Sequence, residues 1–523
     1  MVSWYSTIRS SIEFIKRENY KLEYICQIEL KRGKRELIID DHNKMYQNYL
    51  IDYIKYNIED DERILDLENK LNYIKFQFEM CNVCNISWNE IFSKTKLIDG
   101  LVYNHAYDLN HSYLKERNIV DKSNLNLNNI LSKDIQQYII TSGDQTINVS
   151  ATHNTDNGNV INRSNDDSGA DILDLTEYAV EEEVEEGDKG YEGAVVLEPQ
   201  KGVKELVADL DASQMYPRLM IRSNIFKDTL CGIIAIDYEK YAEAWLYNRD
   251  AFPNEILIKL FNTGNDQIVK MSKNQFEQYL QDKILTPFGT IYWKPSIKRS
   301  LVSDILITLI ANRSKYKKLR DEVTEKYTAS KEANDTDSMK EYARLMDRYD
   351  NLQTAYKSLI NSFYGVMGML MYRLSDMFSA ASITASGREL TRMVAHYGSK
   401  YMDTMIEEKN PKVPFDHVPI DCKTLIGMED IANRPNILYG DTDSVFVHIG
   451  KVVNGIFGSD ISMDEKLDYS WQVIDNVADY LNNYVIRNIL ERKGIDFFDA
   501  DKKYNYEFKK ELIMSKILFG SQK

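Results

Sequence analysis

The sequence lacks long apolar runs and has little cysteine. Across its 523 residues, no apolar run approaches the roughly 20 residues that a membrane-spanning helix needs, so no membrane contact is predicted. The start, MVSWYSTIRS, has no apolar segment behind a basic end, so a secretory signal is not indicated. Five cysteines are too few to staple a chain of this length, which favours a reducing compartment and a cytoplasmic protein. Cys81 and Cys84 form a single C-x-x-C pair, whereas a structural zinc site takes four ligands, so zinc is disfavoured there.

A positive charge excess is also missing, because the chain carries a net charge of −16. Nucleic-acid phosphates attract basic proteins, so this value by itself argues against DNA binding. The stretch from Asp144 to Asp188, however, holds thirteen acidic residues and one basic residue, Arg163, and carries −12 of the total. Basic runs such as Arg313–Arg320 (RSKYKKLR) remain elsewhere. Total charge therefore does not exclude a DNA-binding protein.

The apolar pattern predicts a chain that mixes helices with antiparallel strands. Apolar residues three and four apart predict an amphipathic helix from Asp60 to Glu79. The segment 141–188 is rich in Asn, Ser, Asp and Gly and is predicted to be a disordered acidic linker, with an acidic docking tail as the alternative. Helices are expected at 305–319 and 342–360, joined by a polar, turn-rich tip at 324–341, which together form a long antiparallel hairpin.

Strands and one more helix complete this pattern. Strands are predicted at 194–199 and 205–212, and a helix at 383–400. The stretch 436–450, NILYGDTDSVFVHIG, predicts two short strands joined by a tight acidic turn.

The strongest chemical signal is that turn, Tyr439-Gly-Asp441-Thr-Asp443-Ser444. Two aspartates one residue apart can project toward one site, and hard cations such as Mg²⁺ prefer carboxylate oxygens. The alternative is an ordinary hairpin turn whose acids cap backbone groups.

A second signal is Asp211-Ala-Ser-Gln-Met-Tyr-Pro217, which follows the strand ELVADL. An acid at a strand end is a common metal ligand, and backbone N–H groups at the start of the next helix can meet phosphate oxygens. The alternative is a simple helix cap by Asp211.

The third signal lies on one helical face. Gln353, Lys357, Asn361 and Tyr364 recur at spacings of four, four and three, which brings a cation, an amide and a ring together. Such a face can serve a phosphate, a base or sugar edge and a stacking surface, although alone it is more often only solvated. Arg313 and Lys317 add a cationic pair on the other helix of the hairpin. Acids at two strand ends can hold two cations, and the cations of the hairpin can neutralise a triphosphate.

At these residues the chain resembles the family B DNA polymerases, especially those of tailed bacteriophages. DASQMYP is similar to the family's first palm motif, D-x-x-S-L-Y-P; QTAYKSLINSFYG is similar to its fingers motif, K-x-x-x-N-S-x-Y-G; and YGDTDS matches the third motif, which again lies in the palm. The resemblance runs from Tyr191 to the C-terminus and implies a template-directed DNA polymerase that uses two Mg²⁺ ions, dNTPs and primer–template DNA. Gln214 departs from the family's usual Ser, which affects fine tuning more than activity.

The resemblance also implies roles for individual residues. Asp211 and Asp443 would hold both metal ions together with the carbonyl of Ala212, with Asp441 supporting them as the third palm acid. The remaining residues would contact the incoming nucleotide or the nascent base pair. Nucleotide-binding residues would be Gln214, Met215, Tyr216, Arg313, Lys317, Lys357 and Asn361, with Tyr216 excluding a ribose 2′-hydroxyl, and Tyr364 and Gly365 would line the nascent base pair.

Near the N-terminus, Tyr56-Asn-Ile-Glu-Asp60 resembles the Y-x-x-x-D motif of the family's 3′–5′ exonuclease, with an acidic helix start as the alternative. The Asp-x-Glu motif that precedes it in the family is absent upstream, so this exonuclease site is expected to be incomplete. The tail ELIMSKILFGSQK resembles the strand that leads to the family's primer-gripping K-K-R-Y tract, ahead of the thumb. We therefore expect one piece of a split or truncated polymerase, with companion fragments that carry the thumb and the N-terminal exonuclease, and a possible sliding clamp.

The expected fold class is α+β: an antiparallel palm sheet with helices, an α-helical fingers hairpin, and the C-terminal helical part of an RNase H-like exonuclease domain. The expected boundaries are 1–115 for the incomplete exonuclease part, 116–190 for the linker, 191–301 and 371–523 for the palm, and 302–370 for the fingers. Rival hypotheses are a reverse transcriptase or an RNA-copying polymerase, which the K-x-x-x-N-S-x-Y-G helix disfavours, and a non-catalytic remnant that acts as a DNA-binding assembly subunit. The intact acids and Lys357 disfavour the latter. Nucleic-acid priming is favoured over protein priming.

Overall fold

The computed structural model describes residues 21–32, 41–108, 191–261, 266–369, 372 and 374–520. The predicted linker at 116–190, with its acidic segment, lies outside the described residues. Among the helices that are described, none is long and apolar enough to cross a bilayer. The mixture of helices and antiparallel sheets agrees with the predicted α+β class.

The first sheet carries the acidic motifs. Its five strands are antiparallel, and in spatial order they are β1 (Val196–Leu197), β8 (Ile437–Asp441), β9 (Ser444–Val447), β2 (Gly202–Ala212) and β10 (Phe508–Phe519). The predicted pair of strands around the acidic turn is confirmed as β8 and β9, which pair antiparallel with each other, with a register irregularity between Ile437 and Tyr439. Because β9 also pairs with β2, two stretches that are more than 200 residues apart in sequence become neighbours in the sheet.

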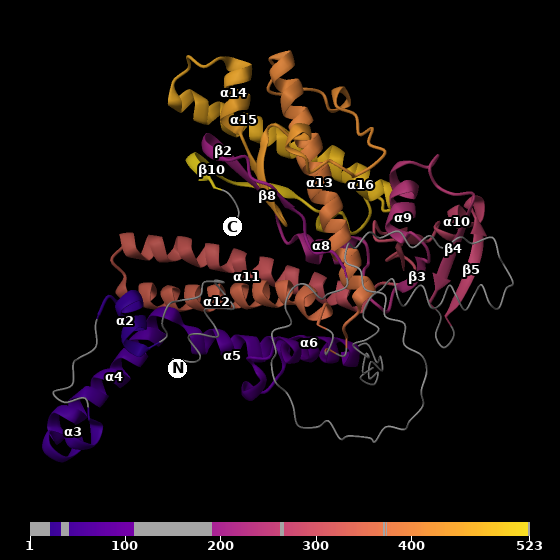
Figure 1. Cartoon of the computed structure of the whole chain (residues 1–523). Coiled ribbons are helices and arrows are strands. Elements are labelled where there is room, and N and C mark those ends of the chain that lie inside the picture. The colour runs from indigo at the N-terminus through magenta and orange to yellow at the C-terminus, as the bar shows by residue number, and fades with distance from the viewer. Residues whose placement is uncertain are drawn as a thin grey trace, which may run out of the picture.

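In sequence order, a second antiparallel sheet lies between the DASQMYP motif and the helical hairpin. Its strands in spatial order are β5 (Gln267–Ser272), β4 (Glu255–Leu260), β3 (Leu230–Ile234), β7 (Thr290–Trp293) and β6 (Lys283–Leu285). Two helices accompany it, α9 (Tyr238–Tyr247) and α10 (Lys273–Tyr279). In Figure 1 this unit sits beside α13 at the opposite end of the molecule from the tip of the hairpin.

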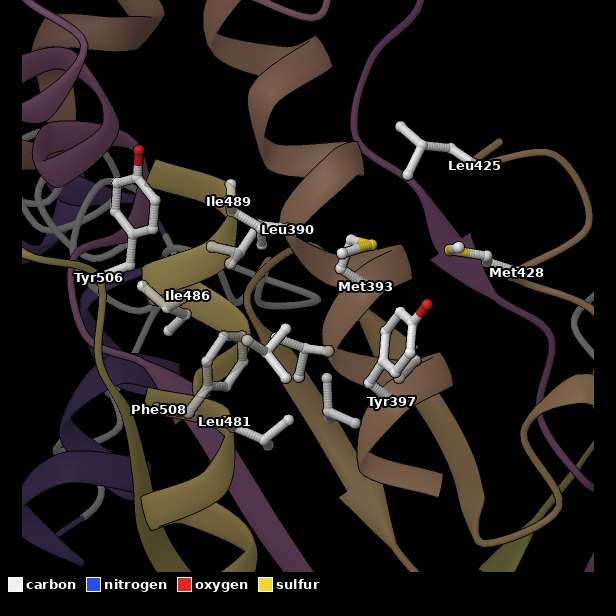
Figure 2. Packing of buried hydrophobic residues seen from close by; sticks show 14 of the residues in the cluster. Leu390, Met393, Tyr397, Leu425, Met428, Leu481, Ile486, Ile489, Tyr506 and Phe508 are labelled. Carbon is white, nitrogen blue, oxygen red and sulfur yellow. The ribbon is translucent and has the colours of Figure 1, made fainter. Parts of the chain in front are cut away.

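Helices cover one face of the first sheet and bury its largest core. They are α13 (Met377–Glu408), α14 (Ile449–Phe457), α15 (Met463–Tyr480), the π-helical turn Leu481–Val485 and α16 (Ile486–Arg492). Leu390, Met393 and Tyr397 of α13 pack with Ile486 and Ile489 of α16 in this core (Figure 2). The predicted helix at 383–400 is therefore confirmed, and α13 extends beyond it at both ends.

Two long helices form the predicted antiparallel hairpin, α11 (Leu301–Glu332) and α12 (Thr336–Met367), which lie side by side in Figure 1. The predicted polar, turn-rich tip at 324–341 is wrong in extent, because only Ala333–Asp335 lies outside the helices. Glu, Lys and Ala in this segment are good helix formers even where they bury nothing, and the Asp335 side chain caps α12 by accepting from the Ser338 N–H.

The N-terminal part is helical and continues along the hairpin. Its helices are α2 (Leu22–Leu30), α3 (His42–Asn48), α4 (Leu50–Leu71), α5 (Tyr73–Cys84) and α6 (Lys94–Asp108). The single predicted helix from Asp60 to Glu79 is wrong, because Asn72 adopts φ +53° and ends α4. Asparagine tolerates this left-handed conformation better than most residues, so it terminates a helix without a glycine.

Helices α5 and α6 pack against the base of the hairpin in one core. Phe76, Met80 and Leu101 belong to the same buried cluster as Leu359 and Phe363 of α12. Cys81 and Cys84 lie in this cluster as well, and burial raises the pKa of the Cys84 thiol to about 12. This pair therefore serves packing, with both thiols protonated at neutral pH.

Short helix α8 (Met215–Arg222) connects the two cores. It follows β2 directly, and it contacts α11, α12 and α13. Helix α8 therefore holds the acidic end of β2 next to the hairpin.

Candidate active site

The sheet brings the two acidic motifs together at the ends of β2 and β9. Asp211 pairs with Ser444 across the sheet, and the Ala212 N–H donates to the Asp443 carbonyl at 2.7 Å. The Ser444 hydroxyl lies 3.5 Å from the Asp211 carboxylate. Antiparallel pairing thus places the predicted acids Asp211 and Asp443 at adjacent positions at the same end of the sheet.

The turn between β8 and β9 is held from several sides. Thr442 adopts φ +54°, a left-handed conformation that a β-branched residue rarely takes. Its carbonyl accepts from the Thr391 hydroxyl at 2.9 Å, and its own hydroxyl donates to Asp441 at 3.0 Å. The exposed Asp441 carboxylate also accepts from the Tyr439 hydroxyl at 3.3 Å. Asp441 is therefore engaged locally, while Asp443 is the more buried of the two.

Burial and mutual repulsion disfavour the charged forms of these acids. The pKa of Asp443 rises from 3.8 to about 6, mainly because burial removes water and secondly because Asp211 is close. The pKa of Asp211 is raised for the same first reason, and Lys357 of α12 counteracts the rise. The site therefore concentrates negative charge that the described protein groups do not fully neutralise.

Two acids that the sequence analysis did not select join this site. Asp209 lies two residues before Asp211 on β2, hence on the same face of the strand, and burial raises its pKa to about 6, with Asp211 adding to the rise. Glu511 of β10 sits at a register shift between Lys510 and Leu512, and it raises the pKa of both Asp209 and Asp211. The period of two along ELVADLDA could have revealed Asp209; the irregular register of β10 left no such signal for Glu511.

Helix α8 begins just after the end of β2 and therefore lies next to the acids. Gln214 adopts φ +55° immediately before the helix, and the Met215 side chain is buried in the core, so only the backbone of Met215 is left to meet a ligand. The ring of Tyr216 lies 4.5 Å from that of Tyr364 of α12, centroid to centroid. Tyr364 shares a hydrogen bond with Tyr191, which fixes this pair of rings at the junction of sheet and hairpin.

Glycine on α13 makes room for Tyr216. A Cβ atom added to Gly387 would lie 3.1 Å from Cε1 of Tyr216 and 3.2 Å from Cε of Met215. These separations are tighter than ordinary van der Waals contact, so the tyrosine seats against the helix because position 387 has no side chain. Gly365, by contrast, faces open space.

The predicted cations of the hairpin lie on α11 and α12, and the charge of Lys357 acts on Asp211. Lys357 is exposed and close enough to lower the pKa of Asp211. Arg313 is partly buried on α11, its Nε has no hydrogen-bond partner within the described part of the chain, and burial lowers its pKa. Lys317 and Asn361 are exposed on α11 and α12. The hairpin therefore offers cationic donors that protein acids do not fully occupy.

The carboxylates of the site repel one another, and a divalent cation between them would be favourable. No group of three or more His, Cys, Asp and Glu within the described residues has the arrangement of a ready metal cage. Yet Asp209, Asp211 and Asp443 all carry raised pKa values, and Oδ1 of Asp209 is buried without a hydrogen-bond partner. A divalent ion would relieve this repulsion, and Mg²⁺ characteristically needs only one or two carboxylates. The donor set therefore fits the predicted ions.

The predicted exonuclease residues lie elsewhere. Tyr56 and Asp60 are on α4, which Figure 1 places beyond the hairpin from the first sheet. Asp60 accepts a 2.9 Å hydrogen bond from the buried Arg63 guanidinium, and the ring of Tyr56 stacks on Tyr53. These contacts belong to the N-terminal helices and do not join the carboxylate site.

Comparison with known proteins adds an independent line of evidence. The family model described as DNA polymerase family B matches residues 135–456, more than half of the chain. The DNA-directed DNA polymerase of Escherichia phage RB69 is 21% identical over 473 residues, which cover 86% of this chain and 40% of that protein. The DNA polymerase delta catalytic subunit of Caenorhabditis elegans is 26% identical over 342 residues, or 61% of this chain and 24% of that protein. A DNA polymerase of Choristoneura biennis entomopoxvirus is 21% identical over 63% of this chain and 29% of its own length. The chain thus spans less than half the length of these relatives.

Proposed function

Because the chain belongs to DNA polymerase family B, we propose that it is the nucleotidyl-transfer core of a DNA-directed DNA polymerase that extends a primer with dNTPs. The observation that carries this proposal is the meeting of Asp211 and Asp443 at adjacent strand ends, joined by the 2.7 Å bond from the Ala212 N–H to the Asp443 carbonyl. The first sheet would be the palm, and α11 with α12 would be the fingers.

Asp211, Asp443 and the Ala212 carbonyl would hold two Mg²⁺ ions. When bound, these ions would supply the positive charge that activates the attacking 3′-oxygen and stabilises the leaving pyrophosphate. The protein's own part is to hold both carboxylates in fixed positions. Sheet pairing does this for Asp211, and the braced turn does it for Asp443.

The nucleotide would lie between sheet and hairpin. Lys357, Arg313 and Lys317 would bind the triphosphate, because cations there stabilise the charge that develops as the pyrophosphate leaves. Asn361 and the backbone at Gln214 and Met215 would add hydrogen bonds. The proximity of Lys357 to Asp211 supports this arrangement, since triphosphate and acids must meet at one place.

The two adjacent tyrosines would select the sugar and check the base pair. Tyr216 would lie under the deoxyribose, where its ring leaves no space for a 2′-hydroxyl, and Tyr364 with Gly365 would line the nascent pair. The 4.5 Å separation of the Tyr216 and Tyr364 rings supports one continuous surface for sugar and base. Exposed Gly365 has nothing within 4 Å of an added Cβ, which leaves room for a ligand.

Primer extension with the Asp443→Asn variant tests this proposal. Loss of one carboxylate should lower the extension rate about 10³-fold or more, because several kcal/mol of transition-state stabilisation disappear. DNA affinity, measured by fluorescence anisotropy, should stay within about twofold, since the carboxylate repels rather than attracts phosphates. Glu407→Gln, an exposed acid near the end of α13, is the matched control. Undiminished extension by Asp443→Asn would refute the metal role, and a wild-type assembly without extension would favour a non-catalytic DNA-binding subunit.

The finer predictions from the sequence keep that status. Phage origin, cytoplasmic location, companion fragments with the thumb and exonuclease, an incomplete exonuclease site and a sliding clamp all stay predictions. Co-purification from the native host tests the companions directly: a polypeptide with a thumb should accompany the chain, and its absence would count against a split polymerase.

A further inference from the structure

Thr391 of α13 reaches out of its helix to the acidic turn. Its side chain is buried, with an exposed fraction of 1%, and its hydroxyl donates to the Thr442 carbonyl at 2.9 Å. Hydroxyls on helices commonly bond back to their own helix instead. Thr404 on the same helix does so, donating to the Lys400 carbonyl at 3.1 Å. Thr391 therefore uses its one side-chain hydrogen-bond donor for a tertiary contact.

The residue that receives this bond is held in an unfavourable conformation. Thr442 has φ +54°, and such backbone persists only where the surroundings enforce it. The other backbone contact of Thr442 is a long one, from its N–H to the Val195 carbonyl at 3.4 Å. Among the described residues, the Thr391 bond is the shorter of the two hydrogen bonds to the Thr442 backbone, and it comes from a long, buried helix.

The Thr442 carbonyl belongs to the peptide that continues into Asp443. Fixing this carbonyl fixes the plane of the Thr442–Asp443 peptide, and hence the direction in which the Asp443 side chain leaves the turn. On its other side, Asp443 is held by the Ala212 N–H, which bonds to the Asp443 carbonyl at 2.7 Å. The two bonds together determine where the Asp443 carboxylate lies relative to Asp211.

We propose that Thr391 is a positioning residue for the reaction, which locks the strained Thr442 turn so that Asp443 faces Asp211. The proposal rests on the proposed polymerase function, because it assigns the position of an acid that this function uses. No motif in the sequence singled out Thr391. Its role comes from a contact between positions 51 residues apart along the chain.

The test compares Thr391→Val with Thr391→Ser. Valine keeps the shape of threonine and removes the donor, whereas serine keeps the donor. In the assembled polymerase, Thr391→Val should lower kcat about 10- to 100-fold with little change in the KM for dNTP, the loss expected when a catalytic group moves by about 1 Å. Thr391→Ser should keep kcat within about threefold of the wild-type value. Thr404→Val, which loses only a bond within the helix, is the matched control and should leave kcat unchanged.

A second readout needs no turnover. Mn²⁺ binding to the full chain, followed by electron paramagnetic resonance, should weaken about tenfold in Thr391→Val and recover in Thr391→Ser, because misplaced carboxylates share an ion poorly. Equal Mn²⁺ affinity and equal kcat in wild type and Thr391→Val would overturn the positioning role while leaving the polymerase assignment intact. If instead Asp443→Asn extends primers as well as wild type does, the polymerase assignment itself fails. A loss in both Thr391 variants, with lowered Tm, would mean that position 391 serves stability alone.

Discussion

At the scale of single residues, the site stores repulsion that stability measurements can detect. The pKa of Asp443 is raised to about 6, so its charged form is disfavoured in the folded chain. A raised pKa contributes stability that is fully present below the unfolded value near 3.8 and is lost as pH rises through about 6. Without metal, the folded chain should therefore lose stability across this window.

Asp443→Asn should accordingly stabilise the metal-free chain at pH 7.5 while it abolishes extension. The expected gain is about 1–2 kcal/mol, less than the full shift implies, because the group keeps some contact with water. Thermal unfolding at pH 7.5 and at pH 4 checks this, since the gain should vanish at the lower pH. Equal Tm values for wild type and variant at pH 7.5 would contradict it.

Metal affinity should follow the same titration. Divalent ions bind the ionised carboxylates, so binding releases protons wherever Asp443 and Asp209 are partly protonated. Apparent Mn²⁺ affinity should fall at least about tenfold for each pH unit below 6 and level off above 7. Calorimetry in buffers of different ionisation enthalpy measures the released protons directly. Affinity independent of pH between 5 and 7 would argue against ligation by these acids.

Gly387 allows a prediction about nucleotide selection. In Gly387→Ala, the new Cβ would lie 3.1 Å from Tyr216 and push its ring away from α13, toward Tyr364 and the proposed sugar site. We expect the KM for dNTPs to rise several-fold, with no gain in ribonucleotide incorporation. Gly398→Ala on the same helix meets only Leu481, at an ordinary 3.5 Å, and should leave the KM unchanged. Matching KM values in the two variants would show that Tyr216 tolerates the methyl group.

Residues inside contiguous motifs were accessible from the sequence, and residues held by tertiary contacts were not. Asp211, Asp443 and Lys357 stand in runs with recognisable spacing, and the structure gathers them. Thr391 carries no such mark, because only the folded turn at Thr442 gives its hydroxyl a partner. The ligands of Asp211, Asp443 and Lys357 remain predictions, although the structure brings these residues together.

At the scale of helices and strands, α13 connects the site to the core. Its Glu389 pairs with the buried Lys493 just after α16, and the Tyr247 hydroxyl of α9 donates to the same carboxylate at 2.5 Å. Both charged side chains are almost fully buried, so each needs the other.

Lys493→Met should destabilise the fold by about 3–5 kcal/mol, because it leaves the Glu389 charge buried without its partner. The double variant Glu389→Gln with Lys493→Met should recover most of this loss, since glutamine still accepts from Tyr247 and carries no charge. Urea unfolding midpoints compare the two. A double variant no more stable than Lys493→Met would mean that the pair acts through packing.

The element boundaries show where pattern reasoning ends. The helix at 383–400 and the strands around the acidic turn follow from apolar periodicity, which burial enforces. The tip of the hairpin does not, because α11 and α12 extend through polar residues that favour helix without burying anything. The break at Asn72 depends on one residue that accepts φ +53°, which periodicity does not register.

At the scale of the whole molecule, the N-terminal helices and the hairpin share one core. Phe76→Ala on α5 should open a cavity worth about 3–5 kcal/mol and speed hydrogen exchange at the base of α12, between 352 and 367. Exchange in β2 should stay unchanged, because β2 belongs to the other core. Phe78→Ala, on the same helix but 55% exposed, is the control. Equal exchange in both variants would mean that α5 does not brace the hairpin.

The edge of the first sheet has a practical consequence for anyone handling the protein. Within the described residues, no strand covers the outer side of β10, which is 12 residues long and exposes Leu512 and Leu518. Lys509, Lys510 and Lys516 along it discourage other molecules from adding a strand, but salt screens such charges. Concentrated stocks in strong salt should therefore be the first to cloud, and dilute buffers of modest ionic strength should keep purified samples monodisperse for longer.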